Sequence, residues 1–193
     1  MIVNKLITQN ELVSIIDNLH RTTTKNIIVA IDGRCASGKT TLGNNLAEYF
    51  GANLFHADEF FLRPEQRVSE RINTPGGNFD VERFYSEIIT GILSEKDFLY
   101  RPFDCKTMTL GEEIRVLSKR LNIIEGSYSC HPDIRNNYDI TVFVSTKPET
   151  QRQRIIIRNK DKAPMFFAKW IPLEEKYFSY FDIKNHCDYI IET

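Results

Sequence analysis

The feature that most constrains this chain is a glycine-rich segment between an apolar run and an amphipathic stretch. The apolar run, residues 27–31, is continuous and rich in β-branched side chains, which is typical of a strand buried on both faces in a parallel sheet. Residues 33–40, GRCASGKT, fit the spacing G-x(4)-G-K-[ST]. Residues 40–50 place apolar side chains at helical spacing. This order of strand, loop and helix predicts an α/β fold that binds a nucleoside triphosphate.

Each residue type in this loop has a use in holding phosphate groups. Glycines let the backbone wrap closely, and the start of the following helix adds N–H groups that attract anions. Lys39 can reach the β- and γ-phosphates, and the Thr40 hydroxyl can bind Mg²⁺. The residues expected to contact the nucleotide are Gly33, Ala36, Ser37, Gly38, Lys39, Thr40 and Thr41.

Length and composition fit a single globular domain over residues 1–193, with an N-terminal helix and loop over 1–25. Of the 193 residues, 41% are hydrophobic and 26% are charged, and the formal net charge is −1. This balance gives no sign of a protein that binds nucleic acid or a membrane surface. The four cysteines are far apart and no secretory leader is visible, so we expect free thiols and a cytoplasmic location.

The rest of the chain alternates between strand and helix patterns, which predicts three layers around a mostly parallel sheet of about five strands. Further strands are expected at residues 53–57, 121–124, 140–144 and 189–191. Helices are expected over 148–159, over most of 163–181, and from Asp80 onward. Residues 62–79 read as loop, and 98–116 as a small hairpin. The aromatic side chains of 166–181 are interpreted as a packing stripe or subunit contact, not as a platform for stacking bases.

Two of the expected strands end in carboxylates. Asp58 follows the strand at 53–57, and Glu125 follows the strand at 121–124. The carboxyl ends of the strands are where ligands bind in open α/β sheets. There Asp58 could accept a proton from an attacking hydroxyl, and Glu125 could bind Mg²⁺ or its water shell opposite Thr40. A solvated turn or helix cap is the alternative interpretation of Asp58.

The ordered set of motifs resembles the uridine kinase family, within the wider group that holds phosphoribulokinase and bacterial pantothenate kinase. The matching pieces are the phosphate loop, D-x-F-[FY] at 58–61, N-F-D at 78–80, an aromatic-Asp pair at 103–104, I-E-G at 124–126, and Y-D-x-x-[VI]-F at 138–143. The resemblance implies that Asp58 is the general base and that Asp80 binds hydroxyls of an acceptor sugar. It also implies that Phe103, Asp104 and the residues up to 109 lie near the acceptor's base, and that Glu125 serves the metal.

A basic segment within residues 150–164 is similar to the lid of this family. Arg154 and Arg158 are four residues apart, and Lys162 continues the spacing if the helix persists. Such a lid closes arginines over the triphosphate and stabilises charge on the transferring group. A solvated basic face is the alternative. Since the family's glycine-containing turn is missing after Asn159, we expect a short lid.

The acceptor segment departs from the family pattern. Residues 100–105 read YRPFDC, where the family carries Tyr-Asp-Phe after a proline, and Arg101 adds a positive charge. Residues 63–67 and 74–77 also differ from typical uridine kinases. A charge at Arg101 would suit an acidic or phosphorylated acceptor as well as a nucleoside, so uridine as the substrate does not follow from the resemblance.

These observations predict an ATP-dependent kinase, with ATP and Mg²⁺ as cofactors, that phosphorylates a hydroxyl of a small molecule. A nucleoside such as uridine or cytidine is favoured. The alternatives are a kinase for a pantothenate-like acid, a vitamin precursor or a sugar phosphate, and a nucleotide-dependent switch with no acceptor. No nucleic-acid or membrane partner is expected, and members of the family often form homo-oligomers. The predicted catalytic residues are Asp58, Lys39, Arg154 and Arg158, the acceptor residues Asp80, Arg101, Phe103 and Asp104, and the metal ligands Thr40 and Glu125.

Overall fold

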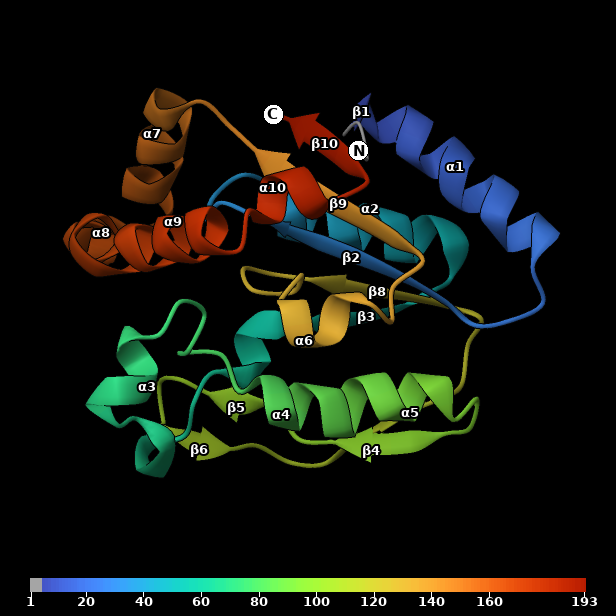
Figure 1. Cartoon of the computed structure of the whole chain (residues 1–193), viewed down its shortest axis with the longest axis horizontal. Helices are drawn as coiled ribbons and strands as arrows, with labels where there is room; N and C mark the ends of the chain where they lie inside the picture. Colours follow the sequence, from blue (N-terminus) through green and yellow to red (C-terminus); the bar gives the residue numbers. More distant parts are fainter. Residues whose placement is uncertain (1–4) are drawn as a thin grey trace.

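A computed structural model describes residues 5–193 and places a six-stranded sheet between two layers of helices (Figure 1). The strand order is β1-β10-β9-β2-β8-β3, and every neighbouring pair is parallel. The strands are β1 (Lys5–Leu6), β2 (Ile27–Gly33), β3 (Asn53–His56), β8 (Leu121–Glu125), β9 (Ile140–Ser145) and β10 (Tyr189–Glu192). The expected three-layer α/β fold is confirmed.

The sheet has one strand more than expected, because β1 is only two residues long and leaves no pattern in the sequence. It pairs with β10 at the edge of the sheet. Residues 1–4, part of the expected N-terminal segment, lie outside the described residues. Within residues 5–193, no helix combines the length and the apolar character needed to span a membrane.

The two faces of β2 divide the core into two halves. Ile27, Val29 and Ile31 pack with apolar side chains of α1 (Gln9–Thr22) and α2 (Lys39–Phe50). Ile28 and Ala30 face the opposite layer. That layer contains α4 (Val81–Phe84), η3 (Tyr85–Ile89), α5 (Thr90–Leu93), α6 (Pro132–Arg135), α9 (Ile171–Tyr180) and α10 (Ile183–His186). Burial of both faces explains the continuous apolar run in β2.

Two short antiparallel pairs lie beside α4 and α5, at the end of the molecule remote from α1 (Figure 1). Strand β4 (Phe98–Tyr100) pairs with β7 (Ile114–Val116), and β5 (Phe103–Asp104) pairs with β6 (Thr109–Leu110). The expected hairpin is therefore present. Its turn lies at residues 105–108, where Met108 adopts a φ of 60°, and not at Gly111.

The interpretation of residues 62–79 as loop throughout is wrong. After η1 (Ala57–Phe60), this stretch forms η2 (Pro64–Gln66) and α3 (Ser69–Asn73). Pro64 is the first residue of η2, a position where the missing N–H of proline leaves no hydrogen bond unmade. The prolines and glycines that suggested a loop separate short helical turns from one another.

The lid segment begins as predicted, with α7 (Pro148–Asn159). The helix ends where Lys160 adopts a φ of 44°, in the left-handed region that the missing glycine would ordinarily occupy. The chain continues as η4 (Lys160–Lys162), α8 (Ala163–Met165) and η5 (Phe166–Trp170). The predicted stripe therefore stops at Arg158, and its extension to Lys162 is wrong because the helix does not persist.

The buried carboxylate of Asp32 joins three separate segments of the chain. One oxygen accepts hydrogen bonds from the backbone N–H groups of Gly33 at 2.7 Å and Tyr128 at 3.2 Å. The other accepts from the Cys130 N–H and the Tyr177 hydroxyl, both at 2.9 Å. Burial raises the pKa of Asp32 to about 6, although the hydrogen bonds from Cys130, Gly33 and Tyr177 act to lower it. The strand, the segment after β8 and α9 are thus fixed around one side chain.

This shift predicts a pH dependence of stability that disappears in Asp32→Asn. The pKa of Asp32 is raised from an ordinary 3.8 to about 6, so the folded chain holds this proton more tightly than the unfolded chain. The resulting contribution is present below pH 4 and is lost as the pH rises to 6. We expect the unfolding free energy of wild type, minus that of the variant, to fall by about 3 kcal/mol over this window. Urea denaturation from pH 4 to 7 measures this difference, and a constant difference would contradict the prediction.

Candidate functional site

A cavity of about 850 Å³ opens at the carboxyl ends of the central strands. Its walls come from the phosphate loop, from η1, from the segment between η2 and α4, from the β5–β6 turn, and from α7 to α9. In Figure 1 the α3 and β5–β6 region lies at the same end of the molecule as α7, α8 and α9. Cavities of this size commonly hold small-molecule ligands.

The phosphate loop has the backbone shape that its sequence predicts. Gly33 has a φ of 135° and Gly38 a φ of 96°. A side chain at Gly33 would meet the Val144 carbonyl oxygen at 2.0 Å, so this position requires glycine. Gly38 caps α2 without a side-chain hydrogen bond, and the first N–H groups of a helix have no acceptor within it. The loop therefore directs free N–H groups toward the cavity.

Two side chains of the loop indicate that it is built for an anion. The Ser37 hydroxyl is buried and has no hydrogen-bond partner among the described residues. The Lys39 ammonium is also buried and folds back onto the loop, donating to the carbonyl oxygens of Gly33 at 2.7 Å and Arg34 at 2.9 Å. Both groups, with the free amides, are the donors that a chain of phosphates would satisfy.

A possible metal-binding pair lies beside the loop. The Thr40 hydroxyl lies 3.1 and 3.2 Å from the two carboxylate oxygens of Glu125, which is itself buried. The His56 Nδ1 lies 2.6 Å from the same carboxylate, and this hydrogen bond raises the pKa of His56. Residues 5–193 contain no group of three or more His, Cys, Asp or Glu side chains that could hold a metal. Mg²⁺ in phosphate-transfer sites needs only one or two protein oxygens besides phosphates and water, so Thr40 and Glu125 fit it.

Asp58 stands on η1, just after β3, and lines the same cavity. Its side chain is open to the cavity, but protein surrounds it on most sides. This partial burial is the main cause that raises the pKa of Asp58, with Lys39 opposing the shift and Glu125 and Glu174 adding to it. A carboxylate with a raised pKa beside the phosphate loop is suited to accept a proton.

Glu174 is a buried carboxylate on α9 that contacts the phosphate loop, and it was not anticipated from the sequence. It accepts hydrogen bonds from the Cys35 N–H at 2.9 Å and from the Ser127 hydroxyl at 2.7 Å. Its neighbour Glu175 forms a two-point ion pair with Arg34, at 2.5 and 2.9 Å. Helix α9 is thereby bound to the loop. Two adjacent glutamates in an aromatic helix are typical of a face exposed to solvent. About 140 residues separate them from the loop, so no sequence pattern linked them to it.

Burial raises the pKa of the Cys35 thiol to about 12, with the Glu174 charge as the second cause. The thiol therefore remains protonated at neutral pH and is a poor nucleophile.

Two lid arginines reach the cavity from α7. Arg154 donates to the Ala36 carbonyl oxygen at 3.2 Å and to the Thr193 hydroxyl at 2.9 Å. The Arg158 guanidinium lies 5.9 Å from the centre of the Phe166 ring. Both line the cavity, on the side of the phosphate loop.

The predicted donor residues lie together, whereas the predicted acceptor residues lie beside the cavity. Asp80 is 1% exposed and caps α4 by accepting from the Arg83 N–H at 3.2 Å. Phe103 is buried, and Arg101 and Asp104 are exposed on the hairpin. None of these four residues lines the cavity, and Gly33 shapes the loop without lining it.

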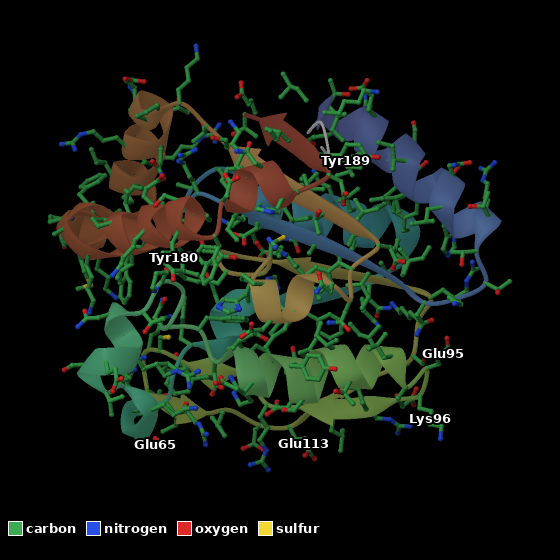
Figure 2. All side chains as sticks on the ribbon, in the orientation of Figure 1. Glu65, Glu95, Lys96, Glu113, Tyr180 and Tyr189 are labelled. Atoms are coloured by element: carbon green, nitrogen blue, oxygen red, sulfur yellow. The ribbon has the colours of Figure 1, made fainter. Side chains whose placement is uncertain are left out.

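Several lining residues were not anticipated. They are Arg67, Asn78, Cys105, Met108, Tyr128 and Trp170. The aromatic stretch divides among three environments. Tyr177 and Phe178 are buried in the core as expected, and Tyr180 is exposed on α9 (Figure 2). Phe166 and Trp170 line the cavity instead of packing inward.

Comparison with known proteins supports the fold. No protein-family model and no curated protein matches the sequence. Among solved structures, the chain resembles a possible uridine kinase from Bacillus stearothermophilus, with a TM-score of 0.67 and 19% identity over 94% of this chain and 98% of that one. It also resembles a candidate fructose transport system kinase from a Silicibacter species, with a TM-score of 0.72 and 20% identity over 95% and 98%.

A third match is the D-glycerate 3-kinase from Cryptococcus neoformans, with a TM-score of 0.62 and 13% identity over 95% of each chain. The three structures and this chain share one α/β fold. At these identities the likeness extends to the fold alone.

The shape of the phosphate loop predicts unequal effects of two glycine substitutions. Gly33→Ala would combine a positive φ with a contact of 2.0 Å to the Val144 carbonyl oxygen. We expect it to lower the unfolding free energy by about 3 kcal/mol or more. Gly51→Ala is the matched control, because Gly51 has a φ of 63° but no atom within 4 Å of the added carbon. It should cost about 1 kcal/mol. Denaturant unfolding measures both, and equal losses would contradict the close approach of β2 and β9.

Proposed function

We propose that this protein is an ATP-dependent kinase that transfers the γ-phosphoryl group to a hydroxyl of a small molecule. One observation carries the proposal: a single cavity brings together the phosphate loop, the Thr40–Glu125 pair, two lid arginines and the Asp58 carboxylate. The first three are groups that hold and neutralise a triphosphate. The fourth is a base placed beside them, which a site for nucleotide binding alone does not require.

The donor half acts through charge and position. The free N–H groups of the loop and the Ser37 hydroxyl bind the phosphate oxygens, and Lys39 leaves the carbonyl oxygens of Gly33 and Arg34 to reach them. Arg154 and Arg158 stabilise the negative charge that spreads over the transferring group. Mg²⁺, held by Thr40 and Glu125 when bound, would neutralise charge on the β- and γ-phosphates.

Asp58 serves the acceptor half. As the acceptor oxygen forms a bond to the γ-phosphorus and the bond from this phosphorus to the β–γ bridging oxygen breaks, the hydroxyl proton passes to the Asp58 carboxylate. The raised pKa of Asp58 brings its proton affinity closer to that of the hydroxyl in the transition state. The products are ADP and a phosphorylated acceptor.

The acceptor is the open part of this proposal. The family resemblance favours a nucleoside, and a hydroxy acid or sugar phosphate is the second candidate. A nucleotide-dependent switch is the competing class, but it gives no use to the part of the cavity that lies beyond Asp58, where apolar side chains of Phe61, Ile72 and Met108 line the wall.

A screen of ADP release tests the proposed activity directly. We expect the protein to hydrolyse ATP slowly by itself, and one class of nucleoside, vitamin precursor, hydroxy acid or sugar phosphate to raise the rate at least about 100-fold. A coupled assay with each compound in turn measures ADP. If no compound raises the rate above background, the switch becomes the better interpretation.

Asp58→Asn separates proton transfer from nucleotide binding. We expect the phosphoryl-transfer rate to fall about 10²–10⁴-fold while the affinity for ATP changes little, because Asp58 contacts the acceptor hydroxyl and not the triphosphate. Glu59→Gln is the control: the Glu59 carboxylate accepts from the Tyr100 hydroxyl at 3.1 Å and does not line the cavity. Ordinary turnover by the Asp58 variant would remove this residue from the mechanism.

A further inference from the structure

We propose that the acceptor carries an anionic group, a carboxylate or a phosphate, which binds to Arg67 in the same cavity as the donor site. This inference rests on the proposed kinase function and names the chemical class of its second substrate. It arises from an arginine that the chain leaves without a carboxylate partner inside its own ligand cavity.

The arginines of residues 63–83 differ in their partners. Arg63 lies 3.4 Å from Glu65, Arg71 lies 2.5 Å from Glu82, and Arg83 lies 3.5 Å from Glu87 and 3.7 Å from Asp80. Glu65, only two residues before Arg67, is at the outer edge of the molecule (Figure 2).

Arg67 differs from these three because it forms no ion pair within residues 5–193, and it is the one of the four that lines the cavity. Three carboxylates of this segment, those of Glu65, Asp80 and Glu82, lie beside the other arginines, and none is within ion-pair distance of Arg67. The charge of Arg67 is therefore available to a ligand.

The Arg67 side chain is held in a defined position. Its Nε donates to the Leu62 carbonyl oxygen at 2.8 Å, and its guanidinium lies 6.0 Å from the centre of the Phe103 ring. These contacts occupy Nε and one face of the guanidinium. The Cys105 thiol is a further hydrogen-bonding neighbour of this side chain, and the remaining N–H groups of the two terminal nitrogens form no ion pair within residues 5–193. A planar pair of N–H donors matches the two oxygens of a carboxylate or a phosphate. Arg67 is thus oriented as an anion-binding group before the ligand arrives.

Arg67 and Asp58 line the same cavity, and the charges of both act on the Cys105 thiol. Burial raises the pKa of the Cys105 thiol, the Arg67 charge lowers it, and the Asp58 charge raises it again. Both charges therefore lie near this side chain, which also lines the cavity. A small acceptor could present its hydroxyl to Asp58 and its anionic group to Arg67 at the same time.

The other groups around Arg67 add to this picture. The Asn78 side-chain nitrogen is buried and has no hydrogen-bond partner among the described residues, so it offers a further donor to an acceptor oxygen. Phe61, Leu62, Ile72 and Met108 supply an apolar wall. The cavity around Arg67 thus combines donors with apolar surface.

Arg67 is exposed at the cavity wall, where an anionic acceptor would pair with its charge through charge-assisted hydrogen bonds, whereas a neutral nucleoside would leave this cation without a partner. The sequence alone predicts the positive charge of the acceptor site at Arg101, and we assign it to Arg67 instead. Arg101 is exposed and its side chain does not line the cavity. Arg67 instead belongs to residues 63–67, the stretch that departs from typical uridine kinases.

Matched pairs of acceptors test the proposal in the coupled ADP-release assay. The pairs are glycerol with D-glycerate and glycerol 3-phosphate, D-ribose with ribose 5-phosphate, and pantothenyl alcohol with pantothenate, and uridine and cytidine are included. We expect an anionic member to have a kcat/KM at least 10-fold above that of its neutral partner and above that of both nucleosides. The carboxylate and phosphate arms identify which anion is preferred.

Neutral compounds that are used as well as their anionic partners would overturn the inference and leave the kinase intact. If no compound raises the rate, the proposed function itself fails. The two failures are therefore distinguishable.

Arg67→Met then tests the residue with the best anionic acceptor. Methionine keeps an apolar stem against Phe103 but removes the charge, so we expect the KM for the acceptor to rise 10- to 100-fold, with kcat and the KM for ATP changed less than about threefold. The KM of Arg67→Lys for the acceptor should lie between those of Arg67→Met and wild type.

Arg63→Met is the matched control, since Arg63 lies on the same segment but is paired with Glu65 and does not line the cavity. It should leave all three constants unchanged, and thermal unfolding checks that each variant is folded. An unchanged acceptor KM in Arg67→Met, or an equal rise in the KM for ATP, would overturn the assignment.

Discussion

The candidate site depends on the hydrogen bonds that converge on the Asp32 carboxylate. This side chain lies at the end of β2, directly before the phosphate loop, and it binds the backbone after β8 and the hydroxyl of Tyr177 on α9. Burying a carboxylate is costly unless donors surround it, so the three segments are held in one arrangement. The phosphate loop, the segment after β8 and α9 are all tied to this carboxylate.

The main elements of the fold could be predicted from the sequence because each carries a strong local pattern. The β-branched run of β2, buried on both faces, and the helical spacing of α2 and α7 are signals of this kind. Residues 62–79 could not be predicted in the same way. Their short helical turns are stabilised by contacts with distant segments, such as the bond from Lys176 to the Asn73 carbonyl oxygen, and these leave no period in the sequence.

The two halves of the candidate site differ in the same respect. The donor half is local: its loop, Thr40 and the start of α2 are contiguous, so spacing alone brings them together. The acceptor half is assembled from side chains that lie far apart in the sequence, including Arg67, Cys105 and Trp170. Motif positions suggested Asp80 and Phe103 there, but both are buried against neighbouring elements instead of facing the cavity. Which residues face a cavity is decided by tertiary packing, which a motif does not encode.

The bonds between α9 and the phosphate loop have a consequence for how this sequence can vary. Arg34 and Cys35 occupy positions at which the loop motif accepts any residue, and here the Arg34 side chain binds Glu175 and the Cys35 backbone N–H binds Glu174. The same helix carries Leu173, which lines the cavity. Only the Arg34 contact depends on the identity of the loop residue, so a substitution at Arg34 would act on the cavity wall through α9. A compensating change at Glu175 would be needed to restore the contact between loop and helix.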